Sequence, residues 1–177
     1  TIKSLGANCV AIATPYDAEF LPYLSAWVAG ARAENLHIWF RGNFAGWEGW
    51  FEYPKITSTD AFLKDLDVFI VSNPQLFQDG DIFTGAPEAE NGGPFGGSFP
   101  HAETYHTFLV DQYRTEQKAF EKIGKKVELN WFSMNGDVAN LYDQNTLDTI
   151  GNLATIDHYI NNATKMDDMI NHFKDGY

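Results

Sequence analysis

The feature that most restricts the fold of this chain is a strict alternation of short apolar runs with segments of helical periodicity. The runs, rich in β-branched and aromatic residues, occupy residues 9–16, 37–43, 82–83, 127–132 and 154–160. The segments with apolar residues at helical spacing occupy residues 20–34, 58–72, 102–123, 138–150 and 165–174. Short apolar runs predict buried strands, and their alternation with helices predicts a parallel sheet joined by right-handed crossovers.

The length of the chain bears on which architecture of this class it adopts. A closed (β/α)8 barrel takes about 250 residues, whereas the 177 residues here supply five of its eight β–α units. The alternative is an open, doubly wound sheet, but neither GxGxxG after the first run nor GxxxxGKS/T occurs in the sequence. We therefore predict an α/β chain of the parallel (β/α) TIM-barrel type, with residues 1–177 as one catalytic domain that is incomplete at both ends. Such a partial barrel would expose strand edges, which another chain or a missing segment would cover.

Composition restricts the partners. The chain has 12 Lys and Arg against 24 Asp and Glu, and its net charge of −12 argues against nucleic acid. No apolar run approaches the roughly 18 to 20 residues of a membrane span, so no membrane partner is expected. The single cysteine, Cys9, cannot form an internal disulfide, which leaves the compartment open, with secretion favoured over the cytoplasm. No HExxH motif or zinc-type Cys/His spacing occurs, so neither a metal nor another cofactor is predicted.

The strongest candidate site is the stretch 81–93, Asp-Ile-Phe-Thr-Gly-Ala-Pro-Glu-Ala-Glu-Asn-Gly-Gly. Buried parallel strands are apolar throughout, so acids just past the carboxyl end of a run indicate a site. Burial and mutual repulsion of Glu88 and Glu90 would keep one of them protonated near neutral pH, as a general acid requires. We expect Glu88 to be catalytic, Glu90 to be a hydrogen-bonding neighbour or substrate contact, and Asn91 to bind substrate. The alternative is an acidic surface loop.

Polar residues near the ends of other runs extend the candidate substrate-binding set. Arg41 and Asn43 end the second run, Asn135 follows the fourth, and His158 and Tyr159 lie in the fifth. An arginine inside a barrel mouth needs a carboxylate or a ligand oxygen as partner, so Arg41 either contacts substrate or forms a salt bridge. A lone histidine near a strand end is more often structural than catalytic, which is the alternative for His158.

The long loop after the second run is rich in aromatic residues. Trp47 and Trp50 lie there between glycines, and exposed indoles suit the apolar faces of sugar rings. Both are therefore candidate substrate-binding residues. The alternative is that the loop aromatics form a small core of their own.

Taken together, the run ends resemble the inner rim of a known enzyme clan. They read Pro15-Tyr16-Asp17, Arg41-Gly42-Asn43, Pro87-Glu88-Ala89-Glu90-Asn91, Asn130-Trp131-Phe132-Ser133-Met134-Asn135 and Asp157-His158-Tyr159. This pattern is similar to that of the clan A glycoside hydrolases, the (β/α)8 retaining enzymes that include glycoside hydrolase family 5. In that clan the fourth strand ends in Asn-Glu-Pro, and Pro87 stands where the clan has Asn.

The resemblance implies a retaining hydrolase that cleaves β-glycosidic bonds of a neutral poly- or oligosaccharide. It makes Glu88 the acid/base, and Asn43 or Asn91 would replace the missing Asn as the contact to the sugar 2-hydroxyl. The clan's nucleophile, a Glu at the end of the seventh strand, would lie beyond Tyr177. The alternatives are a carbohydrate-binding domain without catalysis and a different enzyme on the same fold.

Overall fold

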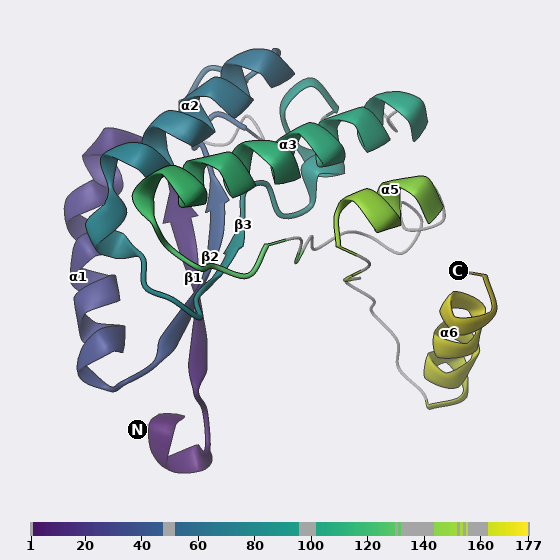
Figure 1. Cartoon of the computed structure of the whole chain (residues 1–177), viewed down its shortest axis with the longest axis horizontal. Helices are drawn as coiled ribbons and strands as arrows, with labels where there is room; N and C mark the ends of the chain where they lie inside the picture. The colour runs from purple at the N-terminus through teal and green to yellow at the C-terminus, as the bar shows by residue number, and fades with distance from the viewer. Residues whose placement is uncertain are drawn as a thin grey trace.

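The computed structural model describes residues 2–47, 52–95, 102–129, 131, 144–151, 153, 155 and 163–176. Within these residues three strands form one parallel sheet in the order β1 (Cys9–Pro15), β2 (His37–Asn43), β3 (Ile82–Thr84). The register places Ala11 beside Trp39 and Trp39 beside Ile82. The sheet therefore has its sequence order preserved in space, with all carboxyl ends at one edge (Figure 1).

The described helices are α1 (Leu21–Ala33), α2 (Thr59–Ser72), α3 (Ala102–Ile123), α5 (Gln144–Thr149) and α6 (Ala163–Gly176). The shorter 3-10 turns are η1 (Ile2–Leu5), η2 (Ala18–Phe20), η3 (Pro74–Leu76), η4 (Ala89–Asn91) and η5 (Gly93–Phe95). The boundaries of the long helices follow local chemistry. The hydroxyl of Ser58 caps α2 by accepting a hydrogen bond from Ala61 N at 3.3 Å, and Gly124 ends α3 at φ +67°.

The core lies on one face of the sheet. Ile12, Phe40 and Phe83 form a buried row across the three strands, and α1, α2 and α3 pack their apolar faces over it. Figure 1 shows α2 and α3 running side by side over this core. On the opposite face Ala11 and Ala13 are exposed. The described part of the sheet is thus covered on one side, unlike most parallel sheets, which are covered on both.

The prediction of a TIM-barrel type fold is wrong. The described residues form a small α/β unit with a three-stranded parallel sheet, whereas a barrel closes eight strands into a ring. The β–α alternation is shared by open and closed parallel sheets, so it could not decide between them. The doubly wound alternative also differs from the structure, because α1, α2 and α3 share one face of the sheet.

The fourth predicted run does not form a full strand over its described residues. Glu128 alone makes a parallel bridge, to Ile82, in which Phe83 N donates to Glu128 O at 2.9 Å and Glu128 N donates to Asp81 O at 2.8 Å. The side chain of Glu128 is exposed, so this stretch lacks the apolar burial of a central strand. The fifth predicted run, 154–160, lies outside the described residues apart from Thr155, which is not in a strand.

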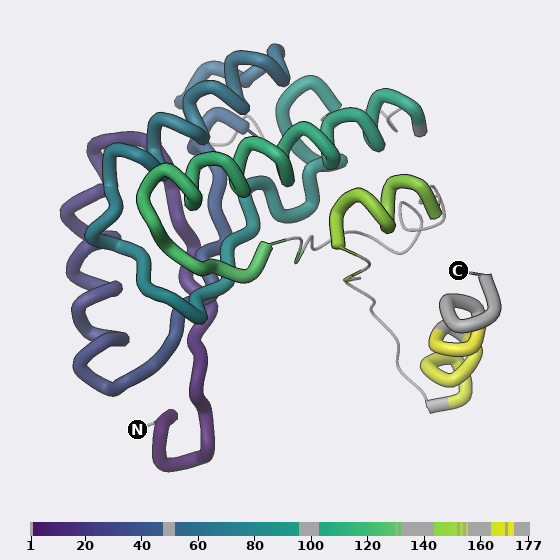
Figure 2. Tube along the Cα trace, viewed as in Figure 1, coloured from purple at the N-terminus to yellow at the C-terminus, as the bar shows by residue number. Residues whose placement is uncertain are grey.

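The last helices were predicted from their periodicity, and α5 and α6 lie within or around the predicted ranges. Figure 2 shows α6 apart from the sheet. Met166 and Ile170 of this helix are exposed. No helix in the described part of the chain has the length and apolarity needed to cross a membrane.

A buried ion pair fixes the amino edge of the sheet, opposite the candidate site. The Asp81 carboxylate has no exposed surface and accepts hydrogen bonds from the Arg32 guanidinium on α1. It also accepts from the backbone N–H groups of Ile38 and Gln78, both at 2.9 Å. Four donors thus satisfy one buried carboxylate and tie α1, β2 and β3 together.

Candidate functional site

The candidate site lies at the carboxyl edge of the sheet, where the segments after the three strands meet. Tyr16 N donates to Asn43 O at 2.9 Å, which joins the end of β1 to the end of β2. The Asp17 carboxylate accepts from Ala45 N at 2.7 Å and holds the loop after β2. In parallel α/β sheets this edge is where ligands bind.

Glu88 has an unusual backbone at this edge. It follows β3 within the same loop and adopts φ 52° and ψ 52°, the left-handed region that non-glycine residues rarely occupy. Its side chain is half-buried, and Asn91 Nδ2 donates to Glu88 Oε2 at 2.6 Å. Asn91 N also donates to Glu88 O at 2.9 Å, closing a tight turn. The structure therefore brings together two residues that the sequence predicted for the site, in a conformation that costs about 1 to 3 kcal/mol.

The turn that carries Glu88 is anchored at Gly85, directly after β3. The Tyr16 hydroxyl donates to Gly85 O at 2.7 Å, and the Glu116 carboxyl of α3 lies so close to Gly85 that a β-carbon there would overlap Oε1. Tyr16 reaches Gly85 by crossing Gly42 of β2, where a β-carbon would overlap the phenol ring. Gln112 Nε2 donates to Glu116 Oε1 at 3.1 Å. One buried contact network around Gly85 thus joins Tyr16, Gly42, Gln112 and Glu116.

Glu116 is the functional candidate that the sequence reasoning missed. It has no exposed surface, and burial raises the pKa of its carboxyl group to about 8, against the lowering effects of its bonds to Gln112 and Gly85. The sequence did contain a signal. Gln112 and Glu116 fall on the apolar stripe of α3, in line with Phe108, Leu109 and Phe120, where a polar residue marks a buried network.

Glu90 points into the protein rather than toward solvent. Its side chain is only 7% exposed, and the Tyr105 hydroxyl donates to Glu90 Oε2 at 3.2 Å. The hydrogen bond of this side chain is thus to Tyr105 of α3, and the predicted role of Glu90 beside Glu88 stays a prediction.

Trp47 lies in the core instead of on a sugar-binding surface. Its exposed fraction is 0%, and its ring packs against Phe62 with centroids 4.2 Å apart. The indole also covers Gly92 and Gly93, where added β-carbons would overlap it. An indole without exposed surface does not stack on a sugar ring, so Trp47 supports the glycine loop after Glu88. Its partners Phe62 and Phe108 belong to α2 and α3, so Trp47 lies in the main core and not in a separate core of the loop.

Other aromatic residues occupy the sheet face that the helices leave uncovered. Trp39 and Trp131 are half-buried and meet edge to face, with centroids 5.7 Å apart. Thr84 Oγ1 accepts from Trp39 Nε1 at 2.8 Å, which holds that indole, and donates to the backbone oxygen of Trp131 at 2.7 Å. The Arg41 guanidinium carbon lies 5.3 Å from the Trp39 ring centroid, so this predicted site residue stacks on an indole.

The remaining predicted site residues divide into two groups. Asn43 is half-buried at the end of β2, where its side-chain oxygen accepts from Phe44 N at 3.0 Å. Trp50, Asn135, His158 and Tyr159 lie outside the described residues.

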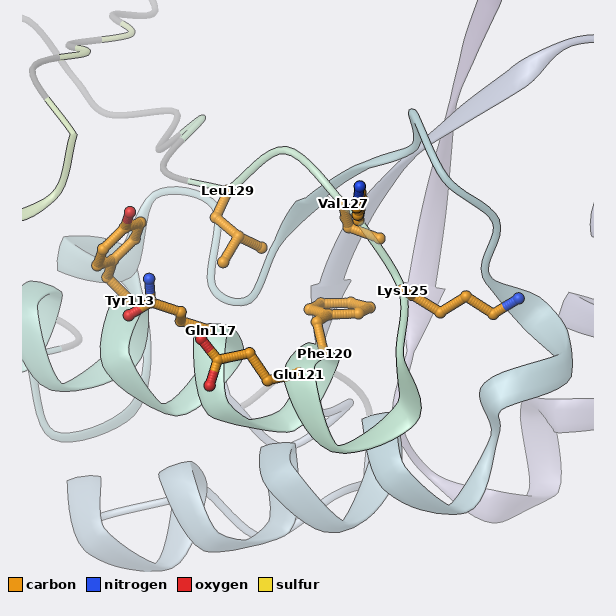
Figure 3. A pocket seen from close by; sticks show the side chains of 8 residues that line it. Tyr113, Gln117, Phe120, Glu121, Lys125, Val127 and Leu129 are labelled. Carbon is orange, nitrogen blue, oxygen red and sulfur yellow. The ribbon is translucent and has the colours of Figure 1, made fainter.

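A cavity of about 210 Å³ lies away from this edge. Figure 3 shows its lining side chains between the C-terminal half of α3 and the segment 125–129, among them Phe120, Val127 and Leu129. Lys126 O accepts from Gly80 N, which places this segment beside the start of β3. The lining residues include none of the predicted site residues, so the cavity is separate from the candidate site.

Among the described residues no group of three or more His, Cys, Asp or Glu side chains is placed to hold a metal ion. Comparison of the chain with protein-family models, with curated proteins and with solved structures finds no match. The function has therefore to be inferred from the chemistry of the residues at the carboxyl edge of the sheet.

Proposed function

We propose that Glu88 is the acid/base of a retaining glycoside hydrolase that acts on the β-linked bonds of a neutral poly- or oligosaccharide, the nucleophile being a second carboxylate about 5 to 5.5 Å from the Glu88 carboxyl group. The observation that carries the proposal is the left-handed backbone of Glu88 at the carboxyl edge of a parallel sheet. A strained residue persists only where its surroundings enforce it, and such residues cluster at active sites.

The surroundings of Glu88 suit a proton-transferring group. Its carboxyl group is half-buried and accepts a hydrogen bond from the exposed Asn91, whose amide can also reach a substrate hydroxyl. Ala86, Ala89 and Glu90 are buried around it, so the turn is held while the carboxyl group keeps access to solvent. The net charge of −12 favours a neutral over an anionic polysaccharide.

Release of reducing sugar from β-linked glucans, mannans and xylans tests the proposal, with the longest natural form of the protein. Glu88→Gln should lower kcat about 10²- to 10⁴-fold, the usual contribution of a general acid or base. Glu121→Gln is the matched control, since Glu121 is an exposed carboxylate on α3. It should stay within about twofold of the native rate.

Two further readouts define the chemistry. An aryl glycoside with a very acidic leaving phenol needs no proton, so Glu88→Gln should still form the glycosyl intermediate from it rapidly. The configuration of the first product, followed by proton NMR, should match that of the substrate if the route is retaining. Native activity that survives Glu88→Gln on every substrate would mean that another carboxyl group is the acid.

The second candidate is carbohydrate binding without hydrolysis. The partly exposed pair of Trp39 and Trp131 on the uncovered sheet face favours it, because sugar rings stack on indoles. Quenching or enhancement of tryptophan fluorescence by oligosaccharides, without reducing-sugar release, would support this candidate over the first.

A further inference from the structure

We propose that Glu116, on α3, is a positioning residue that holds the Gly85 peptide and thereby sets the place of Glu88. The inference rests on the proposed role of Glu88 as acid/base. It concerns a side chain from a different element, buried beneath the site, that does not itself meet substrate.

The Gly85 peptide is held from both sides. Its carbonyl oxygen accepts from the Tyr16 hydroxyl at 2.7 Å, and its other side faces the Glu116 carboxyl, whose pKa the Gly85 backbone lowers. One contact comes from the residue after β1 and the other from α3, so the first peptide after β3 is fixed relative to both layers. A peptide that is hydrogen-bonded on one side and closely packed on the other has little freedom to shift.

The contact between Glu116 and Gly85 leaves no spare room. A β-carbon at Gly85 would overlap Glu116 Oε1 and would also lie 3.1 Å from Leu66 Cδ2 and 3.2 Å from Gln112 Nε2. Only glycine lets the backbone approach the carboxyl group this closely. The acid and the glycine therefore form a matched pair.

A shift of Gly85 would also move Glu88, because Ala86, which lies between them, and Ala89, which follows Glu88, are both packed in the core. Ala86 and Ala89 are 1% and 2% exposed, on either side of the half-buried pair Pro87 and Glu88. A close-packed turn moves as a unit rather than absorbing a shift locally.

The neutral form of Glu116 fits this role. Within the described residues, Glu116 Oε2 and Gln112 Oε1 have no hydrogen-bond partner, and both are acceptors. A proton on the carboxyl group makes Oε2 a donor and removes the charge from a buried group with an unpaired oxygen. Desolvation raises the pKa of this carboxyl to about 8, so it is protonated at neutral pH. Tyr16 is the titratable group facing it, and burial followed by the charge of Glu116 raises the pKa of that phenol well above 10.

Two substitutions of Glu116 test the inference through hydrolysis. Glu116→Met keeps the volume but removes the polar group that faces Gly85, and should lower kcat roughly 10- to 100-fold with a smaller change in KM. Glu116→Gln keeps a polar oxygen there and stays neutral, so its kcat at pH 7 should be near that of the native protein. It should also lack the loss of activity that we expect in the native protein as Glu116 ionises above about pH 8. A Glu116→Met kcat within about twofold of native, in a protein with native circular dichroism, would overturn the inference.

Backbone NMR separates failure of this inference from failure of the proposed function. In the native protein the amide shifts of Gly85 and Glu88 should titrate together near pH 8, and in Glu116→Gln neither should. If no substrate is hydrolysed but this joint titration is seen, the proposed function fails and the positioning role stands. If Gly85 titrates and Glu88 does not, the positioning role is overturned whatever the activity.

Discussion

Replacing Glu116 by Gln should change how the stability of the fold depends on pH. The Glu116 carboxyl has an ordinary pKa of 4.5, and burial raises it to about 8 in the folded chain. Between these values the folded chain holds a proton that the unfolded chain has lost. The free energy of unfolding of the native protein therefore falls as pH rises through this window, and Gln removes the effect because it does not ionise.

The size of the effect follows from the width of the window. Stability changes by about 1.4 kcal/mol for each pH unit over which folding takes up one proton. Between pH 4.5 and about 8 the native protein therefore loses about 5 kcal/mol of its free energy of unfolding, of which about 3 kcal/mol is lost by pH 7. The whole free energy of unfolding of a domain is about 5 to 15 kcal/mol, so the difference is large enough to measure without ambiguity.

Urea unfolding at pH 5, 6, 7, 8 and 9, followed by circular dichroism, measures this difference directly. The free energy of unfolding of Glu116→Gln minus that of the native chain should increase steadily to pH 8 and then level off. Taking the difference cancels the contributions of the other carboxylates, which both proteins share. A difference that stays constant from pH 5 to 9 would refute the burial of an ionisable Glu116 in the folded state.

Two further substitutions test other parts of the structure. Asp81→Ala should destabilise the chain by about 3 to 5 kcal/mol in urea unfolding, because it leaves Arg32 and two backbone donors without their carboxylate; a loss under about 1 kcal/mol would contradict the buried ion pair. Gly92→Ala should lower the free energy of unfolding by about 1 to 3 kcal/mol in thermal unfolding, since the new methyl group meets the buried Trp47 indole. The control is Gly30→Ala, in α1 with open space around it, which should be neutral or stabilising in that assay.

The sequence predicted best the elements whose signals are local. The strand over 9–16 and the helices over 20–34 and 102–123 were found with nearly the observed boundaries, because caps, glycines and periodicity act within a few residues. The number of strands and the closure of the sheet were not predicted. They depend on which strands pair across the fold, and that pairing leaves no mark in the periodicity of any one segment.

Contacts among the predicted site residues follow the same rule. Glu88 and Asn91 were both predicted for the site, and they lie three residues apart, so a single turn brings them into hydrogen-bond contact. The burial of Trp47 could not be predicted in this way, because it depends on Phe62 of α2 and Phe108 of α3, which are distant in the sequence. Glu116 was not predicted, because it is a buried residue on the apolar stripe of α3 and not a residue at the end of a strand.

Because the Tyr16 side chain crosses Gly42 to reach Gly85, the effects of substitutions at several positions distant in the sequence depend on one another. Tyr16, Gly42, Gly85 and Glu116 come from four different segments, yet a larger side chain at either glycine would displace the phenol or the carboxyl group that the other members require. In a combinatorial library, substitutions at these four positions should show strong epistasis, with combined effects that differ from the sum of the single effects. A redesign of this edge of the sheet would therefore have to vary these four residues together.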